Sequence, residues 1–466
     1  MTKSYDLIWI GTGQATGTVI PRLIDLGKKV AIAEGGKFGG SCVNYGCTPT
    51  KTMVASARAA HMARRGPDFG VETGEFQIDF QRVMERQNQI RESGSQGMEN
   101  WLLGLDGVTV FPNYAHFVDT HTIRVGEELI RGETIVVNAG GRPRQVPIEG
   151  LDDVEWLNNA RLLDLDVLPD HLVIVGGSYI GLEFAQIFRR LGSQVTVLEA
   201  GPQLMSREDP DIAETVRKIL SNEGIQIKLN ASIKRVNQPR GNQIDVFFSR
   251  EGQDTKVRGS HLLLAVGRQP NSDRLNLEAA GVEVNRRGYI KVNQIMQTSV
   301  PHIYAVGDIN GEGAFTHTAV NDGEIFWDHY SGEQNRTLEM RIPTYALFID
   351  PPLGRVGMSE TEARASDREI WMATRPMSQI SRAREKDETS GLIKLLVDME
   401  TEEIVGAAVL GVGGDEVVNV LTPFMYTGAS YKLFRKAVLT HPTVAELLPW
   451  ILDDLQPLEQ DQLSKN

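Results

Sequence analysis

The sequence of 466 residues predicts an α/β protein with two Rossmann-like, three-layer ββα nucleotide-binding domains, followed by a C-terminal α+β domain. Three observations support this fold class. An apolar run leads into a glycine-rich turn, a helix and a second strand within residues 5–34. The same pattern returns at 171–200, and from about residue 341 the sequence changes to mixed strands and helices. A strand, a glycine turn and a helix in this order are typical of dinucleotide-binding units.

The first unit begins with the apolar run YDLIWI at 5–10, which enters the turn GTGQATG. Gly11 and Gly13 would let phosphate groups approach the backbone, where the helix N-terminus supplies N–H groups. Glu34 ends the next strand, KVAIAE, at the position where a carboxylate accepts from a ribose hydroxyl. Thr16 stands at the third glycine position of the pattern. We therefore expect a bound dinucleotide at this turn.

Both cysteines of the chain, Cys42 and Cys47, lie in the stretch GGSCVNYGCTPTK. Zinc sites prefer about two to four residues between thiols, and a structural disulfide gains little from so short a loop. In an undistorted helix the two Cα atoms would lie about 8 Å apart, beyond the roughly 7 Å limit for a bridge. Gly39, Gly40 and Gly46 permit the bent backbone that a bridge needs. The pair is interpreted as a reducible disulfide, with two unrelated buried thiols as the alternative.

This stretch resembles the redox-active motif of the class I flavoprotein pyridine nucleotide-disulfide oxidoreductases, the family of dihydrolipoamide dehydrogenase, glutathione reductase and mercuric reductase. The resemblance extends over nearly the whole chain. It implies FAD and NAD(P)H as cofactors, and a homodimer whose active sites are shared between subunits. It also implies that Cys47 is the flavin-side thiol, held as a thiolate in charge-transfer contact, and that Cys42 is the interchange thiol. A helix beginning near Cys47 would lower the pKa of that thiol.

The resemblance implies four segments. They are an FAD-binding domain with the redox-active disulfide over 1–150, an NAD(P)-binding domain over 151–272, a return to the FAD domain over 273–341, and a dimerisation domain over 342–466.

By resemblance, the FAD contacts come from the first glycine turn, the cysteine stretch, the exit strand TIVVNAGGRPRQVPIEG and the later run MQTSVPHIYAVGDINGEGAFTHTA. Asn138 in the exit strand stands where an alanine is more usual. Asp308 would accept from a ribityl hydroxyl, with Gly307 allowing the approach. The expected FAD-binding residues are Gly11, Gly13, Glu34, Gly40, Ser41, Lys51, Gly141, Gly307 and Asp308.

The second unit, HLVIVGGSYIGLEFAQIFRRLGSQVTVLEAG, predicts a second nucleotide site, in which Ser178 replaces the middle glycine. Glu199 ends its second strand, where a carboxylate would bind the adenosine ribose diol and repel a 2′-phosphate. This favours NADH over NADPH, although Arg207 could pair with a phosphate. Tyr179 resembles the aromatic residue that shields the flavin face until the nicotinamide displaces it. By resemblance, the NAD(P)-binding residues are Gly176, Tyr179, Ile180, Gly181, Glu199 and Gly267.

Four further residues are expected at the reacting groups. Glu183, in the apolar run IGLEFA, resembles the acid that pairs with a lysine near flavin N5. We match that lysine to Lys51, although some relatives carry it one position earlier, at Thr50. The tail LTHPTVAELLPWIL carries His441 and Glu446, which by resemblance reach the interchange thiol of the other subunit. The histidine would take that thiol's proton while the glutamate orients its ring.

A basic turn ends the helix expected over 51–65, and it contains Arg58, His61, Arg64 and Arg65. We interpret it as a solvated face whose cations lie favourably near a helix C-terminus. The alternative is an electrostatic funnel for an anionic substrate.

Composition excludes several functional classes. The net charge of −13 argues against a nucleic-acid partner. No apolar run reaches the roughly 18 residues of a membrane span, and the first residues are too polar for a signal peptide. We expect a cytoplasmic protein with no membrane partner and no metal site, where a cysteine pair is more often redox-active than structural.

The predicted function is NAD(P)H-dependent transfer of electrons through FAD to the disulfide, and on to a small-molecule disulfide or a thiol-reactive metal ion. The segments REDPDIAETV, PPLGRVGMSETEAR and ISRAREKDETSGLIKLLVD resemble mercuric reductase and the relatives that defend against reactive chlorine or copper. The chain lacks the additional cysteines of mercuric reductase and keeps His441, which that enzyme replaces. Dihydrolipoamide dehydrogenase remains an alternative, as do a diaphorase or NAD(P)H oxidase and a flavin-bearing redox sensor.

Overall fold

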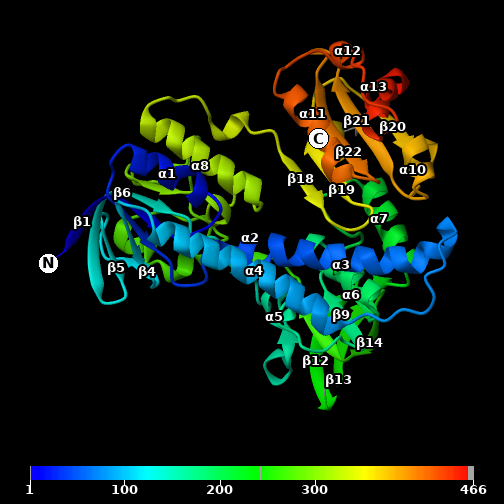
Figure 1. Ribbon diagram of the computed structural model, residues 1–466, viewed down its shortest axis with the longest axis horizontal. Helices are drawn as coiled ribbons and strands as arrows, with labels where there is room; N and C mark the ends of the chain where they lie inside the picture. Colours follow the sequence, from blue (N-terminus) through cyan, green and yellow to red (C-terminus); the bar gives the residue numbers. More distant parts are fainter. Residues whose placement is uncertain (1, 242, 460–466) are drawn as a thin grey trace.

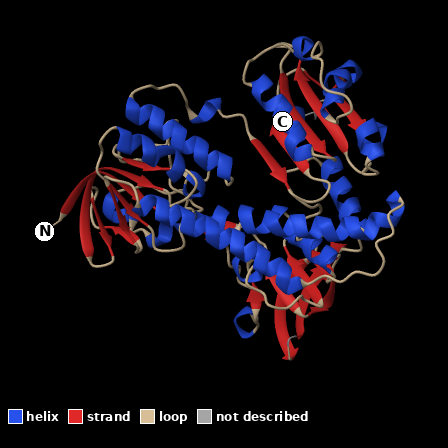
Figure 2. Ribbon diagram, in the orientation of Figure 1, coloured by secondary structure: helices blue, strands red, loops and turns tan. Residues whose placement is uncertain are grey.

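A computed structural model describes residues 2–241 and 243–459 of the chain. Figure 1 shows three bodies that meet along two long helices, α3 (Cys47–Arg65) and α4 (Phe80–Leu103). Each body is built on one larger sheet, and Figure 2 shows helices beside the strands of each. Within the described ranges, no helix combines the length and the hydropathy that a membrane crossing requires.

The first sheet contains seven strands. They are β1 (Lys3–Ile10), β2 (Val30–Ala33), β3 (Val108–Phe111), β4 (Ala115–Phe117), β5 (Thr122–Val125), β6 (Glu128–Val137) and β17 (Ile303–Ala305). The order is β3-β2-β1-β6-β5-β4, with β17 also paired to β6. Helix α1 (Thr16–Asp25) connects β1 to β2, which run parallel, so the strand, turn, helix and strand predicted for the first unit are present.

The second sheet repeats this arrangement with five parallel strands. They are β8 (Trp156–Leu157), β9 (His171–Val175), β10 (Gln194–Leu198), β11 (Gln226–Lys228) and β15 (His261–Leu264). Helix α6 (Tyr179–Leu191) joins β9 to β10, and α7 (Pro210–Asn222) joins β10 to β11. An antiparallel sheet follows, formed by β12 (Ser232–Arg240), β13 (Gln243–Arg250) and β14 (Gln253–Gly259).

A two-stranded link joins these two bodies. β7 (Gly141–Pro143) follows the last residues of β6 in the first sheet, and β16 (Arg268–Pro270) follows β15 in the second. The two short strands pair antiparallel with each other. The chain then returns to the first sheet through β17, and α8 (Thr316–Ser331) lies beside α1 (Figure 1). The exit strand TIVVNAGGRPRQVPIEG therefore contributes one strand of a ribbon that the two bodies share.

The third sheet is antiparallel, with the order β18-β19-β22-β21-β20-β23. Its strands are β18 (Thr344–Leu347), β19 (Leu353–Gly357), β20 (Ile370–Pro376), β21 (Leu392–Asp398), β22 (Ile404–Leu410) and β23 (Gln456–Pro457). Its helices include α9 (Glu360–Arg364), α10 (Ser381–Glu385) and α11 (Gly414–Met425). The mixed strands and helices expected from about residue 341 are confirmed.

The basic turn at the end of α3 differs from expectation. Arg58 donates to Glu388 at 2.7 Å and also pairs with Asp350, while Arg65 pairs with Asp387 at 2.7 Å. The interpretation as a solvated face is therefore wrong for these two arginines. These three acidic partners belong to the C-terminal body, so the turn attaches α3 to that body, while Arg65 also lies 3.5 Å from Asp68 next to the helix.

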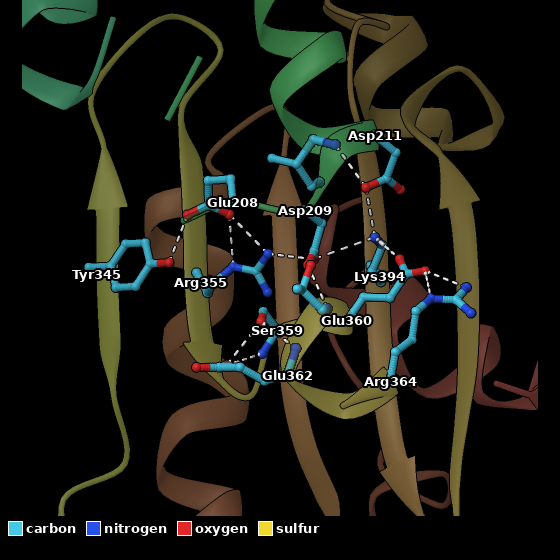
Figure 3. A network of polar contacts seen from close by, with 12 residues as sticks. Glu208, Asp209, Asp211, Tyr345, Arg355, Ser359, Glu360, Glu362, Arg364 and Lys394 are labelled. Carbon is cyan, nitrogen blue, oxygen red and sulfur yellow. Dashed lines mark hydrogen bonds and ion pairs between the residues drawn. The ribbon is translucent and has the colours of Figure 1, made fainter. Parts of the chain in front are cut away.

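A second ion network joins α7 to the C-terminal sheet (Figure 3). Arg355 donates to Glu208 at 2.9 Å and to Asp209 at 2.6 Å, and all three side chains are at most 2% exposed. Burial alone would raise the pKa of Asp209, but the charges of Arg355 and Lys394 outweigh it and hold this pKa at about 2. Because the network crosses between bodies, it fixes how the second sheet lies against the third.

In the described part of the chain, one cluster of carboxylates has the spacing of metal ligands. The ammonium group of Lys394 lies among these carboxylates. That cluster consists of Asp209, Asp211 and Glu360, and Lys394 donates to Asp211 at 2.8 Å and also pairs with Glu360. A cation of the protein itself therefore neutralises these carboxylates.

Substitution of the buried guanidinium tests the importance of this network. We expect Arg355→Met to lower the free energy of unfolding by about 3–5 kcal/mol, because Glu208 and Asp209 would remain buried without their partner. A thermal melt should show a lower Tm. Arg82→Met is the matched control, since Arg82 pairs with Glu85 at 3.2 Å on the surface of α4 and such pairs contribute only about 0–1 kcal/mol. Equal melting temperatures for the two variants would contradict the assignment.

Candidate active site

The cysteine stretch forms two helices with a break between them. Helix α2 (Gly40–Tyr45) carries Cys42, and α3 begins at Cys47 after Gly46 leaves helical geometry with φ −139° and ψ −111°. The bend predicted from the glycines is confirmed, and so is the helix N-terminus at Cys47. Gly40 has a φ of +64°, and a Cβ placed there would lie 3.1 Å from the Cα of Gly13. The cysteine stretch therefore lies directly against the first glycine turn.

Cys42 and Cys47 are both free thiols in this structure. A hydrogen bond from the Cys42 thiol is the largest influence on Cys47 and lowers its pKa to about 6, although desolvation opposes this. The hydroxyl of Thr316, 3.4 Å from the Cys47 sulfur, and the charge of Lys51 lower it further. The same contact and burial raise the pKa of Cys42. At neutral pH the thiolate is therefore Cys47.

Lys51 and Glu183 form the ion pair expected from the sequence. The ammonium group of Lys51 lies 2.7 Å from one carboxylate oxygen of Glu183, which is only 6% exposed. The other oxygen accepts from the backbone N–H of Phe348 at 3.0 Å, and the Phe348 ring lies 4.6 Å below the ammonium group. Helices α3 and α6 and the C-terminal body thus meet at one charged pair beside the cysteines.

The two glycine turns have matching geometry. Gly11 has a φ of +95° and Gly176 a φ of +112°, a region that favours glycine. A Cβ at Gly11 would lie 2.4 Å from the carbonyl oxygen of Asn138, and one at Gly176 would lie 2.4 Å from that of Ala265. In both turns the next strand of the sheet passes too close for any side chain.

The acids that end the second strand of each unit also match. Glu34 accepts from the N–H of Thr12 at 2.8 Å and from that of Gly36 at 2.7 Å. Glu199 accepts from Gly177 at 2.6 Å and from Gly201 at 2.7 Å. Each carboxylate therefore ties the glycine turn to the end of the second strand and places a negative charge beside it.

Two departures from the family pattern compensate for each other. Thr16, at the third glycine position, is fully buried, and its hydroxyl accepts from the Trp9 indole at 3.0 Å. The Asn138 amide, where alanine is more usual, donates to the same hydroxyl at 3.3 Å. The threonine is therefore tolerated because both polar partners lie within the turn.

The residues around Asn138 fit a bound FAD. A Cβ at Gly13 would lie 2.8 Å from the Asn138 amide oxygen, and one at Gly307 would lie 3.2 Å from it. With Gly40 beside Gly13, glycines from three separate segments converge on a surface without side chains, which is what a pyrophosphate requires. At the edge of this surface, the carboxylate of Asp308 is 26% exposed, and burial raises its pKa.

Arg268 is a site residue that the sequence reasoning missed. It donates to the Gly141 carbonyl at 2.5 Å and to the Ser41 hydroxyl at 3.1 Å, and it lies 3.5 Å from Asp308. It thereby joins three of the predicted FAD-binding residues across the two-stranded link. Its position next to Gly267 in the exit strand LLLAVGRQPN was the available signal.

A row of aromatic rings leads from the second glycine turn toward the cysteines. Tyr179, the first residue of α6, packs edge-on against Tyr345, with ring centroids 5.8 Å apart. Tyr345 stacks on Phe315 at 5.6 Å, and the residue after Phe315 is Thr316, the partner of Cys47. Thr316 lies in the run FTHTA, which the sequence analysis assigns to an FAD contact. Its contact with Cys47 could be found only from the tertiary structure.

His441 and Glu446 form a pair in which ring nitrogen Nδ1 lies 2.9 Å from the carboxylate. The His441 side chain is 75% exposed. The flanking helices α12 (Tyr431–Phe434) and α13 (Leu448–Ile451) lie at the outer end of the C-terminal body in Figure 1, away from α2. The structure therefore brings His441 and Glu446 together but leaves them apart from the cysteines of the same chain.

Comparison with known families gives two matches. A model described as pyridine nucleotide-disulphide oxidoreductase matches residues 5–323, and one described as the dimerisation domain of these enzymes matches residues 343–452.

Similar proteins align over nearly the whole chain. RclA of Escherichia coli, described as a probable pyridine nucleotide-disulfide oxidoreductase, is 35% identical and covers 96% of this chain and 98% of its own length. Dihydrolipoyl dehydrogenase of Bacillus subtilis is 31% identical, with coverages of 94% and 96%. Mercuric reductase of Lysinibacillus sphaericus is 29% identical, with coverages of 95% and 81%. A solved structure described as a Cu(II) complex of the HOCl-induced flavoprotein disulfide reductase RclA from Escherichia coli matches at 35% identity, with a TM-score of 0.87 and coverages of 96% and 99%.

The polarised thiol pair gives a pH-dependent prediction. Alkylation of Cys47 by iodoacetamide in the reduced protein should be half-maximal near pH 6, because the thiolate is the reactive form and its pKa is lowered to about 6. We expect Thr316→Val to move this midpoint upward by about half a unit to one unit, since the thiolate loses a hydrogen-bond donor. Peptide mass spectrometry measures the modified fraction at each pH.

Ser331→Ala is the matched control for this experiment. It removes a hydroxyl at the other end of α8, where Ser331 donates to Asp328, and it should leave the alkylation midpoint unchanged. A midpoint that stays near pH 6 in Thr316→Val would show that the hydroxyl does not stabilise the thiolate.

Proposed function

Because this chain belongs to the pyridine nucleotide-disulphide oxidoreductase family and is an FAD-containing oxidoreductase using NAD(P)H, we propose that it transfers electrons to its cysteine pair and on to an external oxidant. The proposed oxidant is a small-molecule disulfide or a thiol-reactive metal ion. The observation that carries this proposal is the polarised contact between Cys42 and Cys47, whose pKa values move in opposite directions. FAD, when bound, supplies the two-electron chemistry between nicotinamide and thiols.

The two thiols have different proposed roles. Cys47, at the N-terminus of α3 with Thr316 and Lys51 beside it, holds the thiolate next to the flavin. Cys42 keeps its proton at neutral pH and meets the oxidant as the interchange thiol. Attack by Cys42 on a disulfide requires a base to remove this proton, because the thiolate is the nucleophile. Among the described residues of one chain, no histidine or carboxylate forms a hydrogen bond with Cys42.

We assign this role to His441 of a second copy of the chain. Its ring is exposed, and Glu446 holds Nδ1, so that Nε2 is directed to accept a proton. The family includes a dimerisation domain over this region. Large apolar side chains are also exposed in the segment 426–450 that carries the histidine, as expected for a surface that a partner covers. They are Tyr426, Leu433, Val438 and Trp450.

The nucleotide contacts keep their predicted assignment in this proposal. FAD binds along the first turn and the glycine surface, and Lys51, held by Glu183, lies at the flavin. The residues assigned to FAD are Gly11, Gly13, Glu34, Gly40, Ser41, Lys51, Gly141, Gly307 and Asp308, with Arg268 added. The residues assigned to NAD(P)H are Gly176, Tyr179, Ile180, Gly181, Glu199 and Gly267. The charge of Glu199 at the second turn favours NADH.

The natural oxidant is the open part of the proposal. The similarity to RclA, whose solved complex is described as containing Cu(II), makes Cu(II) the first metal ion to test. The similarity to mercuric reductase and to dihydrolipoyl dehydrogenase adds Hg(II) and lipoamide. A reducing cytoplasmic location remains a prediction from the use of only two cysteines.

Alkylation separates this proposal from a diaphorase, an oxidase or a sensor. After reduction with NADH and treatment with iodoacetamide, we expect turnover of Cu(II), Hg(II), lipoamide and glutathione disulfide to be lost, because both thiols are needed for exchange. Quinone reduction should survive, since it requires only the flavin. Measuring initial rates with NADH and NADPH side by side also tests the nucleotide preference. Metal and disulfide turnover that survives alkylation would favour the diaphorase or oxidase.

Mixed dimers test the shared site. Cys42→Ser and His441→Gln chains should each be inactive with disulfides as homodimers. In a heterodimer one site would carry both substitutions and the other neither, so a random mixture of equal amounts should recover about a quarter of the wild-type rate. Mixing Cys42→Ser with Cys42→Ser/His441→Gln is the control and should recover nothing. Failure of the first mixture to recover activity, although heterodimers form, would place the base within one chain.

A further inference from the structure

One carboxylate oxygen accepts hydrogen bonds from both tyrosine hydroxyls of the aromatic row. Tyr179 donates to Oε1 of Glu208 at 2.8 Å, and Tyr345 donates to the same oxygen at 2.7 Å. The Glu208 side chain is fully buried, and its other oxygen accepts from Arg355 at 2.9 Å. Glu208 therefore connects the first residue of α6 to the C-terminal body through two independent partners, Tyr345 on β18 and Arg355 on β19 (Figure 3).

The protonation states make this contact directional. Burial raises the pKa of both Tyr179 and Tyr345, and the nearby charge of Glu208 raises both further. Both hydroxyls therefore remain protonated at physiological pH and act as donors to Glu208. A buried carboxylate that loses a donor loses a charge-assisted hydrogen bond, one of the stronger contacts available to a side chain.

The two tyrosines differ in how firmly they are held. Tyr345 lies within a paired strand and stacks on Phe315. Tyr179 lies at the start of α6, directly after the glycine turn, and its ring rests on Tyr345 only by an edge. Of the two rings, Tyr179 is thus the one that can rotate away with the loss of fewer ring contacts.

We propose that Glu208 is a positioning residue that holds the Tyr179 ring over the nicotinamide site, so that the nicotinamide binds only after the hydrogen bond between Tyr179 and Glu208 breaks. This inference rests on the proposed function, in which Tyr179 shields that site. When Tyr179 leaves, Tyr345 and Arg355 still satisfy both oxygens of Glu208, which limits the cost of opening. The C-terminal body therefore sets the affinity for the nicotinamide half of the cofactor.

The two hydroxyls then have opposite effects on binding. Tyr179→Phe keeps the ring and removes the bond that must break, so it lowers the Kd for a reduced nicotinamide. Tyr345→Phe leaves Tyr179 as the sole tyrosine donor to that oxygen, so it strengthens the closed arrangement and raises the Kd. General damage to the site would raise the Kd in both variants.

Isothermal titration calorimetry on the FAD-loaded protein tests this directly. The first probe is 1,4,5,6-tetrahydro-NADH, which has the shape of NADH and cannot transfer a hydride. The second is ADP-ribose, which lacks the nicotinamide and does not need Tyr179 to move. We expect Tyr179→Phe to bind the first probe about tenfold more tightly and Tyr345→Phe about threefold more weakly, with ADP-ribose unchanged in both. Unchanged Tm values establish that both variants fold.

A double variant provides the closing control. In the Tyr179→Phe background, Tyr345→Phe should have no further effect on the Kd, because its effect acts through the Tyr179 hydroxyl. Additive changes, or changes of the same sign in both single variants, would overturn the inference and leave the proposed function standing. If the wild-type protein failed to bind ADP-ribose, the assignment of the second nucleotide site would itself be wrong, and the inference would fall with it.

Discussion

The contact between Cys42 and Cys47, which raises the pKa of the first thiol and lowers that of the second, is the interaction on which the site depends. Without it, burial would favour two neutral thiols, which exchange slowly. The backbone makes this contact possible, because helix α2 ends at Tyr45 and helix α3 starts at Cys47, with Gly46 between them. The break places the receiving sulfur at a helix N-terminus, where a negative charge is favoured. Fold and electrostatics thus act together to keep a proton on the Cys42 sulfur and a negative charge on the Cys47 sulfur.

Glycines determine where the nucleotides can lie. In both units the first glycine of the turn approaches the carbonyl of a neighbouring strand so closely that no side chain fits. Around Asn138 the glycines of three segments converge, and Thr16 is accommodated there only because Trp9 and Asn138 bind its hydroxyl. The consequence is a backbone-lined surface that runs from the first turn toward the cysteines, suited to a phosphate-bearing cofactor.

Buried charge connects the nucleotide domains to the C-terminal body. The three segments that suggested the mercuric-reductase branch, one before α7, one at β19 and one at β21, meet in the network of Glu208, Asp209, Arg355 and Lys394. Ion pairs of this kind contribute less to stability than their number suggests, because desolvation offsets much of the attraction. They do impose one geometry, since each charge is satisfied in only one arrangement of the bodies. Through Tyr179, that geometry extends to the start of α6, directly after the second glycine turn.

The sequence by itself determined the two nucleotide-binding units, the bent cysteine stretch and the pairs of Lys51 with Glu183 and of His441 with Glu446. The two units and the bent stretch follow from local spacing and contiguous motifs, whereas the two pairs were implied by the resemblance to the family. Only the tertiary structure decided the partners of Arg58, Glu208 and Arg268 and the contact of Thr316 with Cys47. Most of these contacts join residues more than 100 positions apart. Such pairings depend on how whole sheets pack, and no local pattern records which distant charge or hydroxyl will fill a given site.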